Sequence, residues 1–83
     1  MNRDTSYELL KEVLKERGEY LHNQYLSAIL TAVQYHKEFG YKIVEASEIA
    51  SEKYQLPRCE KPIRDYMKFI YAKQKERSDR NIG

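Results

Sequence analysis

The chain contains little of what disulfides, long loops and membrane anchors require. Its 83 residues include one cysteine, two prolines and three glycines. A single cysteine excludes a disulfide within the chain and any zinc site that takes two or more of its thiolates. So few glycines and prolines leave little room for long loops. No apolar run approaches the roughly 18 residues that a membrane span needs, and no signal-peptide pattern opens the chain. We therefore expect a cytoplasmic protein without membrane contact.

Charged residues are abundant but unevenly distributed. They make up 34% of the chain, beside 41% hydrophobic residues, a composition typical of a soluble, helix-rich domain. Residues 1–52 carry a net charge of −3 and residues 53–83 a net charge of +5, which gives the chain its net +2. This asymmetry predicts that only the second part meets a polyanion, the alternative being a solvated charged tail.

The spacing of apolar residues predicts an all-α fold, a small three- to four-helix bundle with little or no sheet, in one domain of residues 1–83. The first helix is expected at residues 5–17, in an N-terminal segment of residues 1–18. Thr5 and Glu8 have the spacing of a capping box, and a glycine follows the last turn. Domains of this length often gain stability by dimerising, so we expect a homodimer. Its interface is expected on this first helix and part of the next one, the alternative being that the first helix only closes the core.

The remaining helices are expected within a core of residues 19–76. A helix at 19–38 is apolar around most of its circumference, which predicts a central helix that packs in the core or in both the core and a dimer interface. We expect Gly40 to end it, followed by a β-prone segment at 41–44. A third helix is expected at 46–54, a turn at 56–60 and a last helix at 61–76, with residues 77–83 frayed.

The order of these elements predicts a helix-turn-helix at residues 46–76. The Gly40-Tyr41 break, the sequence Glu48-Ile49-Ala50 and the apolar residues Ile63, Met67 and Ile70 together resemble the DNA-binding domain of the LexA repressor family, over Ile29 to Ile70. Because no glycine-containing hairpin follows the last helix, a wingless version is expected. Glu45 stands where such domains have a Ser, Thr or Asp cap.

The resemblance implies that the last helix enters the major groove of double-stranded DNA. Carried over by position, the groove-facing residues are Arg58, Lys61, Arg64, Asp65 and Lys68. Helical spacing places Lys75 on the same basic side as Lys61, Arg64 and Lys68. The lysines suit phosphate contacts and the arginines bidentate contacts to guanine. The simpler alternative for each residue is a solvated helix surface.

No pattern in the chain indicates an enzyme. His22 and His36 are 14 residues apart, so one helix separates them by about 21 Å and they cannot share a metal ion. Cys59 lies between Arg58 and Lys61, but no histidine next to it in the sequence could serve as its base. We expect no catalytic site, metal or cofactor. Tyrosines at the borders of apolar faces leave a second hypothesis open, a protein-binding adaptor or inhibitor with the same fold.

Overall fold

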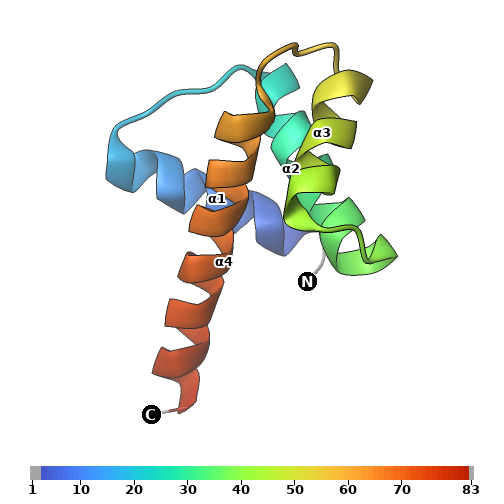
Figure 1. The fold of residues 1–83 in the computed structure, drawn as a ribbon. Coiled ribbons are helices and arrows are strands. Elements are labelled where there is room, and N and C mark those ends of the chain that lie inside the picture. The colour runs from blue at the N-terminus through green and yellow to red at the C-terminus, as the bar shows by residue number, and fades with distance from the viewer. Residues whose placement is uncertain (1–2, 83) are drawn as a thin grey trace.

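The computed structural model describes residues 3–82, which form four helices and no strand. The helices are α1 (Arg3–Arg17), α2 (Asn23–Phe39), α3 (Ile43–Lys53) and α4 (Glu60–Ile82). Helices α2 and α3 pack side by side, α4 crosses in front, and α1 lies behind α4 (Figure 1). The expected all-α bundle is confirmed. No helix in this part of the chain has the length and apolarity needed to cross a membrane.

The second helix begins at Asn23, so the prediction that it starts at residue 19 was wrong. Gly18 adopts a left-handed conformation with φ of 64°, and the Glu19 amide donates to the Leu14 carbonyl at 2.9 Å. This bond closes the last turn of α1 and turns the chain away from its axis. His22 has an extended backbone, and its carbonyl accepts from the amides of Tyr25 and Leu26.

The third helix begins at Ile43, three residues before its predicted start, and includes half of the segment predicted as β-prone. Lys42 precedes it with an extended backbone, and the Glu45 carboxylate accepts the Lys42 amide at 3.3 Å. Glu45 therefore stabilises the first turn from its third position, as in a capping box. Because Ile43 also packs against the core, local capping and tertiary contact outweigh the strand preference of a β-branched pair. Gly40 ends α2 as expected, with φ of 78°.

The fourth helix runs to Ile82 and therefore extends beyond its predicted end at residue 76. Arg77, the first residue of the expected frayed tail, bonds to Glu12 of α1. The two residues are 65 positions apart in the sequence, so the spacing of neighbouring residues could not predict this ion pair. At the other end, the Ile63 amide donates to the Cys59 carbonyl, and Pro62 occupies the first turn, where its missing donor costs little.

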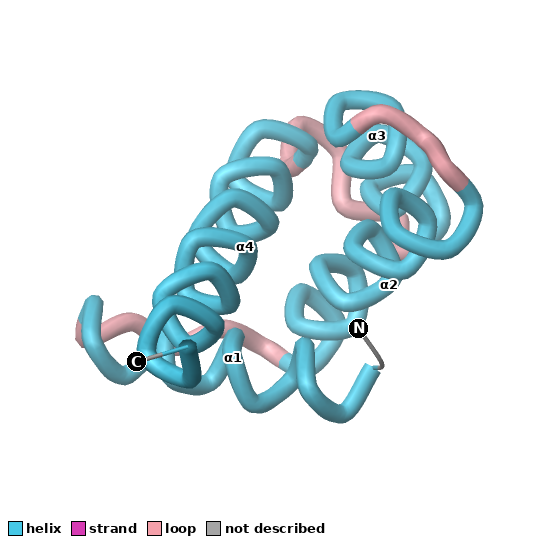
Figure 2. The backbone as a smooth tube through the Cα atoms, turned by 90° about the horizontal axis from the view of Figure 1, so that it is seen from below, coloured by secondary structure: helices cyan, strands magenta, loops and turns pink. Residues whose placement is uncertain are grey.

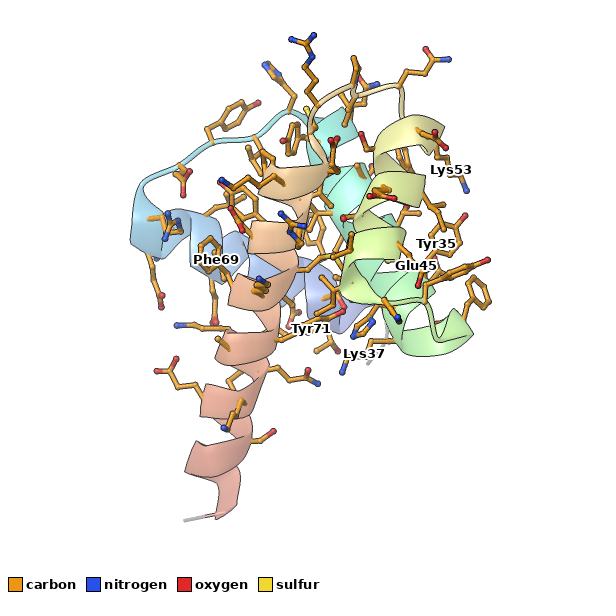
Figure 3. All side chains as sticks on the ribbon, in the orientation of Figure 1. Tyr35, Lys37, Glu45, Lys53, Phe69 and Tyr71 are labelled. Atoms are coloured by element: carbon orange, nitrogen blue, oxygen red, sulfur yellow. The ribbon has the colours of Figure 1, made fainter. Side chains whose placement is uncertain are left out.

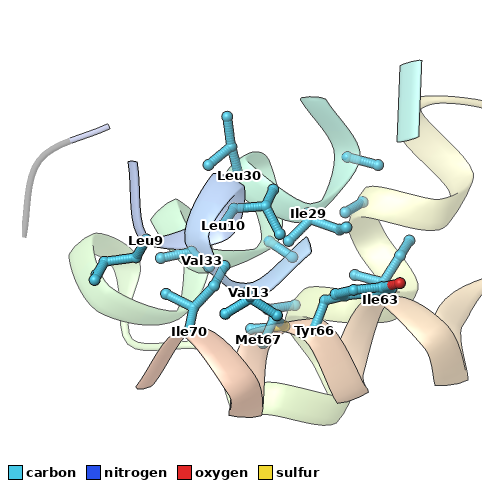
Figure 4. Packing of buried hydrophobic residues seen from close by; sticks show 14 of the residues in the cluster. Leu9, Leu10, Val13, Ile29, Leu30, Val33, Ile63, Tyr66, Met67 and Ile70 are labelled. Atoms are coloured by element: carbon cyan, nitrogen blue, oxygen red, sulfur yellow. The ribbon is translucent and has the colours of Figure 1, made fainter. Parts of the chain in front are cut away.

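The core lies between all four helices. Six consecutive α2 residues, Ala28 to Val33, are buried, so α2 is packed on more than one side, as expected of a central helix. Leu9, Leu10 and Val13 of α1 meet Ile63, Met67 and Ile70 of α4 around it (Figure 4). Thr31, the one polar residue in the buried α2 segment, bonds to the Tyr54 hydroxyl at 2.9 Å. Burial of this apolar surface supplies most of the stability of the fold.

Helix α1 lies across α2 and α4 and, within the described residues, does not contact α3 (Figure 2). Its apolar side chains Leu9, Leu10, Val13 and Leu14 are all buried within one chain. The apolar face of α1 therefore closes the core of its own chain.

Candidate nucleic-acid interface

Helix α4 presents one face to the core and the opposite face to solvent. Ile63, Met67 and Ile70 recur at intervals of four and three residues and are fully buried, which fixes the rotation of the helix about its axis. The side chains on the opposite face therefore point away from the core. These are Lys61, Arg64, Asp65, Lys68, Ala72 and Lys75, and we call them the outer face of α4.

The structure brings together five of the six predicted DNA-binding residues on this outer face. Lys61, Lys68 and Lys75 are exposed, and Arg64 and Asp65 are half-buried. With a rise of 1.5 Å per residue, Lys61 and Lys75 are about 21 Å apart along the helix. The cations thus form one stripe, long enough to follow several phosphates.

Arg58, the sixth predicted residue, lies apart from this stripe. It is exposed in the turn between α3 and α4, with φ of 64°. There it lines a small groove together with Glu48, Glu52 and Glu60. Its surroundings are therefore more acidic than those of the cations on α4.

Other cations of α4 serve the fold. Lys73 pairs with Glu16 of α1 and, at 3.9 Å, with Glu76 of its own helix, and Arg77 pairs with Glu12. The hydrogen bond that Lys73 donates to Glu16 raises the pKa of Lys73. Among the side chains described (residues 5–78), Lys61, Arg64, Lys68 and Lys75 form no ion pair. Helix α4 thus carries cations that hold α1 on one side and unpaired cations on the other.

The acidic outer side of α3 was not anticipated from the sequence. Glu45, Glu48 and Glu52 are all exposed, and their spacing of three and four residues places them on one stripe. Applying helical spacing to a helix that starts at Ile43 finds this stripe, whereas a start at residue 46 leaves Glu45 outside. The positive charge of α4 therefore does not continue over this side of α3, whose one basic residue, Lys53, lies at the end of the helix.

A shallow groove of about 510 Å³ borders the first turns of α4 and was also not anticipated. Leu21, Tyr25 and Phe69 give it apolar walls, and Lys61 and Asp65 lie at its edge. The Tyr66 hydroxyl donates to Glu19 at 2.8 Å on the same side of the molecule. Burial, followed by a hydrogen bond with Cys59, raises the pKa of Tyr25.

The histidines and the cysteine do not form a common site. His22 is exposed before α2, outside the helix on which it was predicted, and His36 Nδ1 lies 2.7 Å from the Tyr41 carbonyl. Cys59 is half-buried at the start of α4, next to Tyr25. In the part of the chain that the structure describes, no three His, Cys, Asp or Glu side chains gather as a metal-binding group.

The fold defines a small all-α domain with a helix, a turn and a basic helix in succession. No family model, no curated protein and no solved structure matches the chain. The resemblance to the LexA repressor domain therefore stays a prediction from the sequence. The interpretation of the outer face of α4 depends on its own geometry and charge.

Proposed function

We propose that this chain is a small, non-enzymatic DNA-binding regulator of transcription that places the outer face of α4 in the major groove. The observation that carries the proposal is the division of cations on α4. Lys73 and Arg77 pair with α1, whereas Lys61, Arg64 and Lys68 pair with no described carboxylate. Because Lys61 and Lys68 are exposed and none of the three cations is held by a described carboxylate, they are available to phosphates. Among the described residues, the outer face is therefore the surface that we assign to a polyanion.

Each residue of the stripe would have a distinct role. Lys61, Lys68 and Lys75 would neutralise phosphates and release counterions, which supplies most of the affinity. Arg64, half-buried and therefore more restricted, would make a bidentate contact to a guanine edge. Asp65 would accept from cytosine, or restrain a neighbouring cation. Arg58 lies beside three glutamates, which would repel phosphates, so we place it at the margin of the DNA contact.

The acidic stripe on α3 restricts how the duplex can approach. Glu45, Glu48 and Glu52 would repel phosphates at close range. The DNA backbone would therefore pass along the side of α4 that faces away from α3. This differs from helix-turn-helix domains in which the first helix crosses the backbone.

We further propose that the chain binds DNA as a homodimer and acts in the cytoplasm. Helix-turn-helix dimers place their recognition helices on half-sites one helical turn apart, which doubles the number of phosphate contacts. The apolar face of α1 is buried in its own chain, so we place the dimer surface on another part of the molecule.

A charge-reversal series tests the proposal. Arg64→Glu and Lys68→Glu should each abolish binding to a labelled random duplex, measured by fluorescence anisotropy, while circular dichroism shows unchanged helicity. Lys15→Glu is the matched control, because Lys15 is exposed on α1 and its reversal changes the net charge equally. Wild-type affinity should fall with a log–log salt slope of roughly −0.9 per phosphate contact. Absence of affinity at low salt, or an equal loss in Lys15→Glu, would contradict the proposal.

A protein-binding adaptor or inhibitor is the second candidate. It is favoured by the exposed aromatic side chains Phe39 and Tyr41 and by the acidic stripe on α3. This candidate predicts no DNA affinity even at low salt, so the same anisotropy series distinguishes the two functions.

A further inference from the structure

Apolar side chains gather at the surface where α2 passes into α3. Phe39 is 59% exposed and Tyr41 is 42% exposed. The Tyr35 ring joins them, with its centroid 5.5 Å from that of Phe39 and 6.0 Å from that of Tyr41. We call Tyr35, Phe39 and Tyr41 the aromatic patch. Contiguous exposed apolar surface of this kind marks a binding site more often than single exposed residues do.

The other exposed aromatic side chains do not form such a surface. Tyr20 is 83% exposed, and its ring lies against the ring of His22, with 5.8 Å between the centroids. Tyr7 lies under the ammonium of Lys11, on the outer side of α1. The large apolar residues of α1 and of the centre of α2 are buried. Within the described residues, apolar surface is therefore concentrated at the patch.

The patch is held in place before any partner binds. Gly40, with φ of 78°, turns the chain between Phe39 and Tyr41. The Tyr41 amide donates to the Tyr35 carbonyl at 3.3 Å, and the Tyr41 carbonyl lies 2.7 Å from His36 Nδ1. Lys53 lies 5.8 Å from the centroid of the Tyr35 ring. Because these contacts already restrict the aromatic residues, association costs less conformational entropy.

The charges around the patch are balanced. Glu38 and Glu45 are acidic, and Lys42 and Lys53 are basic, so each sign occurs twice. Tyr35, Glu45 and Lys53 lie together on the α2–α3 side of the molecule (Figure 3). A polyanion or a uniformly charged partner would meet as much repulsion as attraction. A two-fold axis, by contrast, can bring the acidic residues of one rim opposite the basic residues of an identical rim.

We propose that a second copy of this chain docks on the aromatic patch, forming a two-fold dimer in which the patches of both copies face each other. Buried apolar area supplies the association energy, and the mixed rim fixes the orientation. The inference rests on the proposed function for the role of the dimer, and it supplies the dimer surface that α1 does not. The patch belongs to the end of α2 and the turn before α3, so the outer face of α4 stays open to DNA.

Complementary charges at Phe39 test the docking directly. Wild-type protein should dimerise in sedimentation velocity, and Phe39→Glu and Phe39→Lys should each raise the dissociation constant by about tenfold or more, because central aromatic residues dominate interfaces. A mixture of the two variants should dimerise again, since a two-fold interface brings residue 39 near its counterpart. Tyr20→Glu is the matched control, an exposed aromatic outside the patch, and should dimerise as wild type does. Circular dichroism and thermal unfolding verify that each variant is folded.

Three results would overturn the inference. The first is a wild-type protein that stays monomeric at the highest concentration measured. The second is a mixture of Phe39→Glu and Phe39→Lys that stays monomeric although wild type dimerises. The third is a Tyr20→Glu variant that no longer dimerises. Arg64→Glu separates the two proposals, because this variant should lose DNA affinity and still form the dimer. A wild-type dimer without DNA affinity would refute the proposed function alone, whereas a monomer that binds DNA would refute this inference alone.

Discussion

At the scale of single residues, the bond between Tyr66 and Glu19 connects α4 to the loop after α1. The Tyr66 hydroxyl donates to Glu19 at 2.8 Å. This bond, with a smaller contribution from Arg17, lowers the pKa of Glu19. Burial, followed by the bond to Glu19, raises the pKa of Tyr66 to about 12. The pair should therefore affect stability at both ends of the pH range.

Tyr66→Phe should raise the pKa of Glu19 toward its ordinary value of 4.5, measured by NMR titration of the side-chain carboxyl. A depressed pKa in the folded state stabilises the fold above the unfolded value, and this contribution is lost as pH falls through the folded value. The contribution of Tyr66 is present below pH 10 and lost as pH rises toward 12. Tyr66→Phe should therefore lose less of its free energy of unfolding than wild type does, both as pH falls through the pKa of Glu19 and as pH rises toward 12.

Tyr20→Phe is the control for this titration, because it removes a hydroxyl from an exposed tyrosine. It should leave the pKa of Glu19 unchanged. An unchanged Glu19 titration in Tyr66→Phe would show that the bond is not formed in solution.

The buried Thr31 hydroxyl makes a second residue-scale prediction. Thr31→Val leaves the Tyr54 hydroxyl without this bond, which should lower the free energy of unfolding by about 1 kcal/mol. The companion variant Tyr54→Phe removes the other partner. Urea unfolding of both single variants and the double variant completes a cycle. Strict additivity would mean that the two hydroxyls do not interact.

At the scale of helices, the connection from α2 to α3 depends on a left-handed residue. Gly40→Ala should lower the free energy of unfolding by about 1 kcal/mol, since a Cβ disfavours φ of 78°. Apart from Gly40 and its two chain neighbours, no residue has an atom within 4 Å of the position that Cβ would take, so the cost is conformational. Gly40→Asn should cost less, because asparagine tolerates this region better. Equal costs in thermal unfolding would contradict this explanation.

The sequence was informative where helix signals are local. Apolar spacing located four helices, and Gly18 and Gly40 marked two ends, because left-handed caps are encoded by one residue type. The start of α3 was missed, since Ile43 and Val44 favour strands and the Glu45 bond to Lys42 is visible only after the turn is built. The extension of α4 depends on Arg77 meeting a residue of α1, which no window of neighbouring residues contains.

At the scale of the whole molecule, charge is segregated between elements. Exposed glutamates line one side of α3, and cations without ion-pair partners line the outer face of α4. Composition by halves predicted the sign of each part, and helical spacing predicted that Lys61, Arg64 and Lys68 share a face. The division between cations that hold α1 and cations left unpaired could not be predicted, because it depends on how α1 crosses α4 (Figure 2).

The aromatic patch, too, could be predicted only in part from the sequence. Spacing placed Tyr35 at the border of an apolar face, and Phe39 lies one turn further along α2, but Tyr41 joins them only because the chain turns at Gly40. Two surfaces on different helices are then available in one small domain, one charged and one apolar. The account assigns DNA to the first and a second copy to the second.

The most direct test of the central claim is an NMR titration of the ¹⁵N-labelled protein with a short random duplex at low salt. The account predicts that amide shifts change along the outer face of α4, at Lys61, Arg64 and Lys68, and reverse when salt is added. Amides of the acidic stripe, at Glu48 and Glu52, should stay unchanged. Shifts centred on α3 or on the aromatic patch, or no shift change at any duplex concentration, would contradict the claim that α4 binds DNA.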